Sequence, residues 1–267
     1  MIRCIVAGAA GRMGRRLVAN IAATEGFELV GALEYPGCPL LGEDSGTIAG
    51  IKPTGVPLTA ELEPLLGSAD VLIDFATGGV IEAATAAAAR DVAAVIGTTT
   101  LGDEGKRALA ALAAGGARIV AAGNMSVGVN LLYKLVAEAA KILGDGFDVE
   151  IVEMHHNRKQ DAPSGTAARL AEVVCGAFDR DPAKDLRYGR QGVVGARTRR
   201  EIGIHSLRGG DVVGDHTVIF ASEGERVELT HKASSRDTFA RGALRAAAFL
   251  AAAPAGLYDM QDVLGLK

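Results

Sequence analysis

The stretch MIRCIVA at residues 1–7, followed by GAAGRMG at residues 8–14, decides the fold of this chain. The first segment is a short apolar run typical of a buried strand, and the second is a glycine-rich turn with the spacing GxxGxxG. Apolar residues at helical spacing follow over residues 15–23. A strand, a glycine turn and a helix in this order favour dinucleotide binding, because the turn exposes the N–H groups of the helix to a pyrophosphate. Taken alone the spacing is a weak signal, since an ordinary turn can also carry glycines for packing.

Strand and helix patterns alternate through the first half of the chain. Further strands are predicted at residues 27–33, 70–75, 92–96 and 117–121, with helices at residues 80–90 and 103–114 between them. Alternation of this kind predicts a parallel sheet with right-handed crossovers.

The pattern changes after residue 126. A long amphipathic helix is predicted at residues 129–143, an alternating strand at 147–154, a helix at 164–178, several strands between 192 and 229, and a last helix at 235–253. We expect the last helix to return to the first domain. The prediction is an α/β protein: a Rossmann-like doubly wound parallel sheet over residues 1–126 and 236–267, with a second α+β domain on an open mixed sheet over residues 127–235.

Composition excludes several classes of protein. The chain has 267 residues, of which 49% are apolar and 4% aromatic, so it has enough apolar mass for a core and is not typical of a disordered protein. A net charge of −4 argues against a nucleic-acid partner, and no apolar run reaches the roughly 18–20 residues of a membrane span. The N-terminus shows no signal-peptide layout, and Cys4, Cys38 and Cys175 form no CxxC pair. A cytoplasmic location is therefore expected.

The second predicted strand ends at Glu34. An acid at this place accepts hydrogen bonds from the adenosine ribose hydroxyls and repels a 2′-phosphate. The next residue is Tyr35 rather than a cation, although Arg12 in the glycine loop could still reach a phosphate. The residues therefore favour NADH, with NADPH as the alternative, unless Glu34 is only a solvated acid at a strand end.

Small polar loops follow two other predicted strands. One contains Gly97, Thr98 and Thr99, and the other runs from Ala122 through Gly123 and Asn124 to Met125. In a doubly wound sheet these loops lie at the carboxyl edge beside the cofactor. Either loop alone could be a simple turn, but together with the glycine loop they suit the ribose and nicotinamide end.

The stretch EMHHNRKQDAPSGTA at residues 153–167 is the richest in chemistry. His155 and His156 end a strand and Lys159 follows, so the segment offers proton donors and acceptors. Ser164 is a candidate N-cap, and the N–H groups beside it suit a carboxylate. Structural roles for one of the histidines remain an alternative. Adjacent histidines on a strand point to opposite faces, and no HExxH or cysteine cluster occurs, so no metal site is predicted.

These residues carry a resemblance to a known family. The matching stretches are residues 6–15, 97–99, 124–130, 153–156, 159–166, 231–236 and 239–240. On them the chain resembles the dihydrodipicolinate reductase family of bacterial lysine and diaminopimelate synthesis.

The resemblance implies a reaction and a set of site residues. The family reduces the cyclic dicarboxylate 4-hydroxy-tetrahydrodipicolinate to tetrahydrodipicolinate with loss of water, using NADH or NADPH. It implies His155 as proton donor or acceptor, Lys159 as proton donor, and a homotetramer assembled through sheets of the second domain. The implied substrate contacts are His156, Ser164, Gly165 and Thr166. The implied cofactor contacts are Gly8, Ala9, Ala10, Gly11, Arg12, Met13, Glu34, Gly97, Thr98, Thr99, Ala122, Gly123, Asn124 and Met125.

Three positions depart from the family pattern, and two other functions stay open. Thr100 and Met125 stand where a glycine and a phenylalanine are frequent, near the expected nicotinamide end. Tyr35 stands where many members carry an arginine for the 2′-phosphate, which puts a preference for NADPH in doubt. The alternatives are another NAD(P)-dependent dehydrogenase of the same fold and a non-catalytic dinucleotide sensor. A sensor would explain the glycine loop and Glu34 but would leave residues 155–166 without a role.

Overall fold

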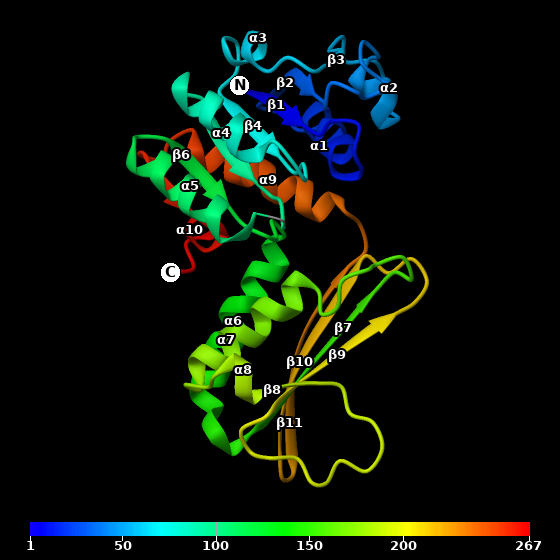
Figure 1. Ribbon diagram of the computed structural model, residues 1–267, viewed down its shortest axis with the longest axis vertical. Coiled ribbons are helices and arrows are strands. Elements are labelled where there is room, and N and C mark those ends of the chain that lie inside the picture. The colour runs from blue at the N-terminus through cyan, green and yellow to red at the C-terminus, as the bar shows by residue number, and fades with distance from the viewer. Residues whose placement is uncertain (100) are drawn as a thin grey trace. The chain divides into compact units, whose positions relative to one another are not determined.

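The computed structural model describes residues 1–99 and 101–267, and Thr100 lies outside them. The chain folds into two compact units (Figure 1). The first unit contains Met1–Val127 and Arg236–Lys267, and the second contains Gly128–Ser235. Each unit has its own sheet and its own apolar core.

A seven-stranded sheet forms the centre of the first unit. Its strands are β1 (Ile2–Ala7), β2 (Phe27–Leu33), β3 (Leu58–Thr59), β4 (Val71–Asp74), β5 (Ala93–Ile96), β6 (Arg118–Ala121) and β12 (Gly256–Tyr258). They lie in the order β12-β6-β5-β4-β1-β2-β3, and every neighbouring pair is parallel. The predicted doubly wound parallel sheet is therefore confirmed.

Helices cover both faces of this sheet. They are α1 (Arg12–Ala23), α2 (Ser45–Ala49), α3 (Glu63–Leu66), α4 (Val80–Ala89), α5 (Gly102–Ala114), α9 (Asp237–Leu250) and α10 (Met260–Leu264). Successive strand residues point to opposite faces, so Cys4 and Val6 of β1 enter the core formed with α1 and α9. Ile5, between them, faces α3 and α4 instead. Burial on both faces explains why residues 4–7 of β1 are a continuous apolar run rather than an alternating one.

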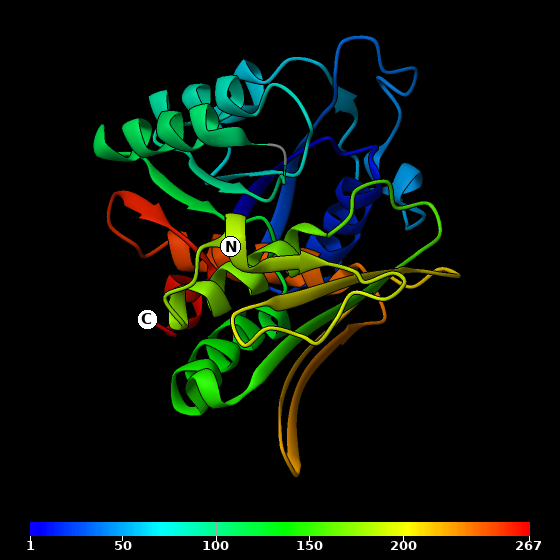
Figure 2. The same cartoon turned by 60° about the horizontal axis from the view of Figure 1, so that its bottom comes forward.

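The second unit is built on a mixed sheet. Its strands are β7 (Asp148–His155), β8 (Leu186–Tyr188), β9 (Ile202–Arg208), β10 (Gly214–Ser222) and β11 (Glu225–Ala233), in the order β11-β10-β7-β9-β8. The pairs β7–β9 and β8–β9 are parallel and the others antiparallel, which confirms the predicted mixed sheet. Figure 2 shows β10 and β11 as a long curved hairpin. The strands predicted between residues 192 and 229 are β9, β10 and β11; the first begins only at Ile202, because residues 192–201 form a loop, and the last ends at Ala233.

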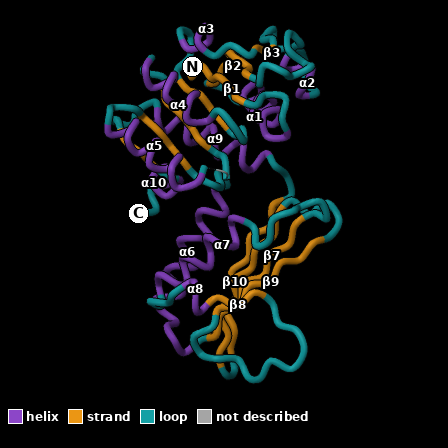
Figure 3. Tube along the Cα trace, viewed as in Figure 1, coloured by secondary structure: helices purple, strands orange, loops and turns teal. Residues whose placement is uncertain are grey.

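Helices lie on one face of the mixed sheet, as the separate colours of helices and strands in Figure 3 make clear. They are α6 (Val127–Leu143) and α7 (Gly165–Ala177), followed by the short α8 (Pro182–Asp185), and a 3₁₀ turn, η1 (Gly144–Gly146), precedes β7. Val149 and Ile151 of β7 pack against these helices in one core with Phe220 of β10. The intervening residue Glu150 faces the other side of the sheet, where it pairs with arginines of the 189–201 loop. Among the described residues, no helix is long and apolar enough to cross a membrane.

Candidate active site

The glycine loop joins β1 to α1 through a close backbone contact. Gly8 has a left-handed φ of +67°, and its carbonyl oxygen accepts a hydrogen bond from the N–H of Gly11 at 3.0 Å. A Cβ at Gly14 would lie 2.0 Å from that same oxygen, so only glycine lets the helix approach the turn. Gly11, which has no side chain, occupies the N-cap of α1. The turn and helix therefore form the open N-terminus that a pyrophosphate requires.

Glu34 lies against this loop. Its Oε1 accepts a hydrogen bond from the N–H of Ala10 at 2.8 Å, and its own N–H donates to the carbonyl oxygen of Thr59 at 2.8 Å. The chain folds this way because Glu34 directly follows β2, the parallel neighbour of β1. The structure thus brings together the acid and the glycine loop that were predicted to hold the adenosine ribose and the pyrophosphate.

The loops after β5 and β6 show different degrees of exposure. Thr98 is buried, and Gly97 faces the ring of Phe75, because a Cβ at this position would lie 2.3 Å from the ring. Met125 has a side chain that is 0% exposed and belongs to the core, where its carbonyl oxygen lies 1.7 Å from the place of a Cβ at Gly242. Gly97 and Met125 therefore serve packing, and both residues are buried.

Ala9 and Asn124 also have structural roles. Ala9 is buried in the core of the first unit, and its N–H donates to the carbonyl oxygen of Leu33 at 3.1 Å. The side-chain oxygen of Asn124 accepts a hydrogen bond from the N–H of Ser126 at 2.9 Å, which shapes the turn that leads into α6. By contrast, Arg12 at the start of α1 is exposed.

Sequence reasoning assigned no role to Asp74, the last residue of β4. Its side chain is buried, and its Oδ1 accepts a hydrogen bond from the N–H of Ala76 at 2.7 Å. Burial raises the pKa of Asp74, which the hydrogen bond from Ala76 opposes. The only signal in the sequence was an acid at the end of an apolar strand, which is also typical of an ordinary turn.

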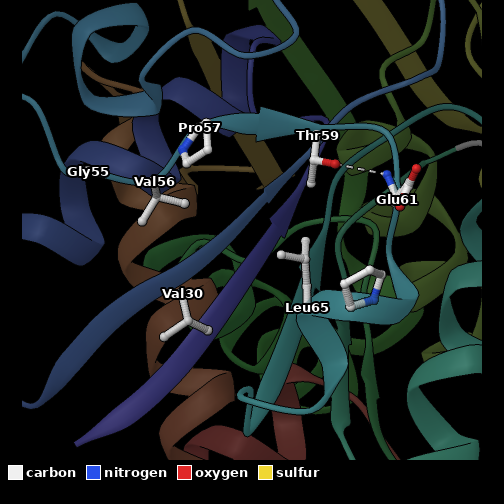
Figure 4. Close-up of a pocket in the computed structure, with 8 residues that line it drawn as sticks. Val30, Gly55, Val56, Pro57, Thr59, Glu61 and Leu65 are labelled. Atoms are coloured by element: carbon white, nitrogen blue, oxygen red, sulfur yellow. Dashed lines mark hydrogen bonds between the residues drawn. The ribbon is translucent and has the colours of Figure 1, made fainter.

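A pocket of about 350 Å³ lies elsewhere in the first unit, at the edge formed by β2 and β3 (Figure 4). Val30 and Leu65 supply apolar walls, and Thr59 accepts a hydrogen bond from the N–H of Glu61 at 3.2 Å. Its lining contains none of the residues predicted to bind a cofactor. The glycine loop therefore remains the candidate cofactor site of this unit.

In the second unit, His155 is the last residue of β7 and is 9% exposed. Its Nδ1 lies 2.5 Å from Oε2 of Glu153, two residues earlier on the same face of the strand. Glu153 is 0% exposed, and Arg208 binds both of its oxygens, each at 3.0 Å. Burial opposes the ionisation of Glu153, but hydrogen bonds from His155, Arg208 and Ser206 outweigh it and lower the pKa of Glu153 to about 2.

Ser164 is the N-cap of α7, as predicted. Its Oγ accepts a hydrogen bond from the N–H of Ala167 at 3.2 Å and lies 3.1 Å from Nε2 of His216. The Ser164 side chain is buried, so its hydroxyl serves the cap and His216. The next residue, Gly165, is exposed, and a Cβ there would meet open space. The hydroxyl of Thr166 hydrogen-bonds Tyr133, whose pKa burial raises to about 12.

Lys159 lies in the turn between β7 and α7. Its Nζ is 2.8 Å from both oxygens of Asp161, and its N–H donates to the carbonyl oxygen of His156 at 3.1 Å. Nδ1 of His156 accepts a hydrogen bond from the N–H of Arg158 at 3.2 Å. Within the second unit the segment therefore joins a buried histidine, a paired lysine and the open N-terminus of α7.

Sequence reasoning missed three residues of this cluster. Glu153 could have been found, because it lies two residues before His155 on a predicted strand and therefore on the same face. Arg208 and His216 could not, because β9 and β10 bring them beside His155 and Glu153 by strand register. The rings of His155 and His216 pack edge to face with centroids 5.1 Å apart, and burial lowers the pKa of His216 to about 3. Among the described residues, no group of three or more His, Cys, Asp or Glu could hold a metal ion.

Comparisons with known proteins identify the family of this chain. The family model "Dihydrodipicolinate reductase, N-terminus" matches residues 2–125, and "Dihydrodipicolinate reductase, C-terminus" matches residues 128–264. The 4-hydroxy-tetrahydrodipicolinate reductase of Anaeromyxobacter sp. (strain Fw109-5) is 55% identical over 100% of this chain and 99% of its own length. That of Syntrophotalea carbinolica is 53% identical over the full length of both.

Solved structures show the same relationship. Dipicolinate-bound dihydrodipicolinate reductase from Paenisporosarcina sp. TG-14 is 28% identical, with a TM-score of 0.76 over 98% of each chain. A myo-inositol dehydrogenase from Corynebacterium glutamicum, at 16% identity and a TM-score of 0.62, shares the fold alone. The chain therefore belongs to the dihydrodipicolinate reductase family, the NAD(P)H-dependent oxidoreductases that reduce 4-hydroxy-tetrahydrodipicolinate in lysine biosynthesis.

Proposed function

We propose that His155 and Lys159 carry out the proton transfers of this reductase, with His155 as proton donor or acceptor and Lys159 as proton donor. The observation that carries the proposal is the arrangement of the second unit, where Glu153 holds His155 and Asp161 holds Lys159 within one short segment. The three cysteines are free and buried, which supports the expected action in a reducing cytoplasm.

The reaction takes up one hydride and one proton and releases one water. NAD(P)H, when bound, supplies the hydride, and the geometry of hydride transfer requires a separation of about 3–3.5 Å in the reacting complex. This chain must supply the proton that the departing hydroxyl needs. An ammonium or imidazolium group does so near neutral pH, and this gives Lys159 and His155 their roles.

The N-terminus of α7 is proposed to hold the substrate. The N–H groups at Gly165 and Thr166 point out of the first turn of the helix, and a helix N-terminus favours a negative charge. His156 and Lys159 add donors from the preceding turn. Ser164 acts indirectly, by fixing this turn through its buried hydroxyl. The dipicolinate bound in the Paenisporosarcina relative is a dicarboxylate, which supports a site with several anion-binding groups.

The first unit is proposed to bind the nicotinamide cofactor through its glycine loop. Residues 8–13 would receive the pyrophosphate, Glu34 the adenosine ribose, and residues 97–99 and 122–125 the nicotinamide end. Glu34 carries a negative charge where a 2′-phosphate would lie, and the exposed Tyr35 supplies no cation. We therefore propose NADH as the favoured cofactor, with NADPH accepted at similar or lower efficiency.

The proposed homotetramer forms through the mixed sheet. Its helices cover only one face, and Leu207 on the other face is exposed. Light scattering after size-exclusion chromatography should give four times the chain mass of 27.4 kDa. A monomer at micromolar concentration would contradict this assembly.

Substitution of the two proton-transfer residues tests the proposal. We expect His155→Ala and Lys159→Ala each to lower kcat by roughly 10²–10⁴-fold, the usual contribution of acid–base catalysis. The substrate is generated by the upstream synthase, and turnover is followed by the loss of nicotinamide absorbance. Lys106→Ala is the matched control, because Lys106 is an exposed lysine that pairs with Asp103 on α5. Near-normal turnover in either purified variant would remove that residue from the mechanism.

A further inference from the structure

Glu153 is the most deeply buried charged group of the second unit, and donors from His155, Arg208, Ser164 and Ser206 surround its two oxygens. Oε2 lies 2.5 Å from Nδ1 of His155 and 3.0 Å from Nη1 of Arg208. Oε1 accepts from Nη2 of Arg208 at 3.0 Å and from the N–H of Ser164 at 3.2 Å. A buried carboxylate is stable only when it is paired and hydrogen-bonded in this way. The site thus contains an ionised carboxylate fixed in position before any ligand arrives.

An ionised carboxylate decides which nitrogen of a histidine carries the proton. Glu153 can only accept hydrogen bonds, so Nδ1 of His155 must donate. In the neutral ring Nε2 then has a free lone pair, and it is the atom at which His155 gains or loses its second proton. In the parallel register of β7 and β9, His155 lies directly beside Arg208. The two strands therefore position both His155 and the arginine that binds Glu153.

The surroundings leave room at Nε2. A Cβ at Gly214 would lie only 3.0 Å from this atom, so the glycine at the start of β10 keeps that side of the ring uncrowded. His216 packs against the ring of His155, and its pKa of about 3 keeps it neutral, so it does not repel a protonated His155. Arg208 also donates to the carbonyl oxygen of Asp161 at 2.7 Å. This hydrogen bond links Arg208 to Asp161, the residue that pairs with Lys159.

We propose that Glu153, clamped by Arg208, is the positioning residue of this site: it holds His155 in the Nδ1–H tautomer and leaves Nε2 as the proton-exchanging atom. The inference rests on the proposed role of His155 in proton transfer. Glu153 itself does not touch the substrate in this scheme, so it acts on the rate of the proton-transfer step rather than on binding.

Imidazole nitrogen spectroscopy tests the tautomer in the unmodified protein. The wild-type chain is labelled with ¹⁵N-histidine and its spectrum recorded at pH 8, and the signals of residue 155 are assigned by their loss in His155→Gln. We expect Nδ1 to be protonated and Nε2 unprotonated. A neutral ring with its proton on Nε2 would overturn the proposal, and this measurement needs no substitution at Glu153.

Kinetics then test whether the clamp matters for turnover. Glu153→Gln keeps the size of the side chain and removes its charge. We expect kcat to fall about 10–100-fold, a part of the roughly 10²–10⁴-fold that an acid–base group contributes. The KM values for substrate and NADH should change less than about threefold. An unchanged kcat, or a loss confined to KM, would overturn the proposal.

Glu150 offers a matched control on the same strand. It lies on the opposite face of β7 and pairs in the same manner, with Nε2 of His205 at 2.7 Å and with Arg190 and Arg197. Glu150→Gln removes a comparable ion-pair cluster away from the site, so we expect it to alter the melting temperature while kcat stays within about twofold of wild type. An equal loss of kcat in Glu150→Gln and Glu153→Gln would assign the effect to general destabilisation and overturn the proposal.

A double variant separates this inference from the proposed function beneath it. Because Glu153 is argued to act through His155, adding Glu153→Gln to His155→Gln should lower kcat by less than about threefold more. Fully multiplicative effects would show that Glu153 acts independently of His155 and would overturn the positioning role. If His155→Gln alone kept near-normal turnover, the proton-transfer role itself would fail, and the tautomer would then have no catalytic meaning.

Discussion

Nζ of Lys159 lies 2.8 Å from each carboxylate oxygen of Asp161, so the proposed proton donor is already paired with an anion in the chain itself. The lysine side chain is only 18% exposed, whereas that of Asp161 is 64% exposed. A dicarboxylate that binds Lys159 must therefore compete with a carboxylate that the protein supplies.

The first prediction concerns this competition. Asp161→Asn removes the competing charge, and we expect dipicolinate, used as a stable dicarboxylate probe, to bind about two- to fivefold more tightly. The change is small because an ion pair with one exposed partner is worth little in water. Titration calorimetry measures the affinity, and Asp103→Asn, which breaks the surface pair with Lys106, serves as the control. Weaker binding of dipicolinate in Asp161→Asn would show that Asp161 positions Lys159 rather than competes for it.

The second prediction concerns cofactor choice. Tyr35 is 61% exposed directly after Glu34, so an arginine can replace it without entering the core. We expect Tyr35→Arg to raise kcat/KM for NADPH relative to NADH by about tenfold, because a guanidinium forms charge-assisted hydrogen bonds with a 2′-phosphate. Steady-state kinetics with both cofactors measure the ratio.

The wild-type ratio checks the same interpretation. We expect wild type to favour NADH or to use both cofactors similarly. A strong wild-type preference for NADPH would contradict the interpretation of Glu34 and Tyr35, and loss of that preference in Arg12→Gln would assign the recognition to Arg12.

The long elements could be predicted from the sequence, and the short ones could not. Residues 27–33 form β2 as predicted, because seven residues show a clear strand pattern. The two-residue β3 and the four-residue α3 are too short to show a period. β3 forms by pairing with β2 at the edge of the sheet, and α3 forms by packing Leu66 on the same face as Ile5. The start of α1 was predicted at Arg15, but the helix begins at Arg12, since the glycine loop already has helical hydrogen bonding from Gly11.

The site shows the same division between local and long-range information. His155, Lys159 and the cap at Ser164 lie within ten positions, so their chemistry is visible in a linear motif. Arg208 and His216 reach the cluster only through the pairing of β7 with β9 and β10. Register depends on the whole sheet, and no local pattern in the sequence encodes it.

The third prediction tests the close packing of the glycine loop. Gly14→Ala would place a Cβ 2.0 Å from the carbonyl oxygen of Gly8 and 2.6 Å from Cα of Ala9. These neighbours are backbone atoms of the turn, so α1 must move away from it. We expect a loss of about 1–3 kcal/mol in the free energy of unfolding, as for other overpacked sites, together with weaker NADH binding.

Gly67→Ala is the control for this substitution. Gly67 has a φ of −65° and a Cβ there would meet no atom within 4 Å, so alanine should be tolerated with unchanged NADH affinity. Urea unfolding and fluorescence titration of NADH measure the two effects. Equal behaviour of the two variants would contradict the close-packing role of Gly14.

The fourth prediction concerns pH and the buried imidazole of His216. Burial lowers the pKa of His216 from 6.5 to about 3. As the pH falls below 6.5, the unfolded chain takes up a proton at this residue while the folded chain does not, so acidification favours unfolding. Each such proton contributes a slope of up to about 1.4 kcal/mol per pH unit. The stability contributed by neutral His216 is therefore present above pH 6.5 and is lost progressively between pH 6.5 and about 3.

Urea unfolding at pH 7, 6 and 5, at one protein concentration, measures this slope. We expect His216→Asn to reduce it, whatever the substitution does to the absolute stability, because an amide does not titrate. Glu150→Gln should keep the wild-type slope in this range, because the pKa of Glu150 is lowered from 4.5 to about 2. Burial opposes the ionisation of Glu150, but hydrogen bonds from Arg190, His205 and Arg197 outweigh burial. The stability that Glu150 contributes is accordingly lost only below about pH 4.5. An unchanged slope in His216→Asn would mean that His216 takes up its proton in the folded protein. The assignment of a neutral His216 ring beside His155 would then be wrong.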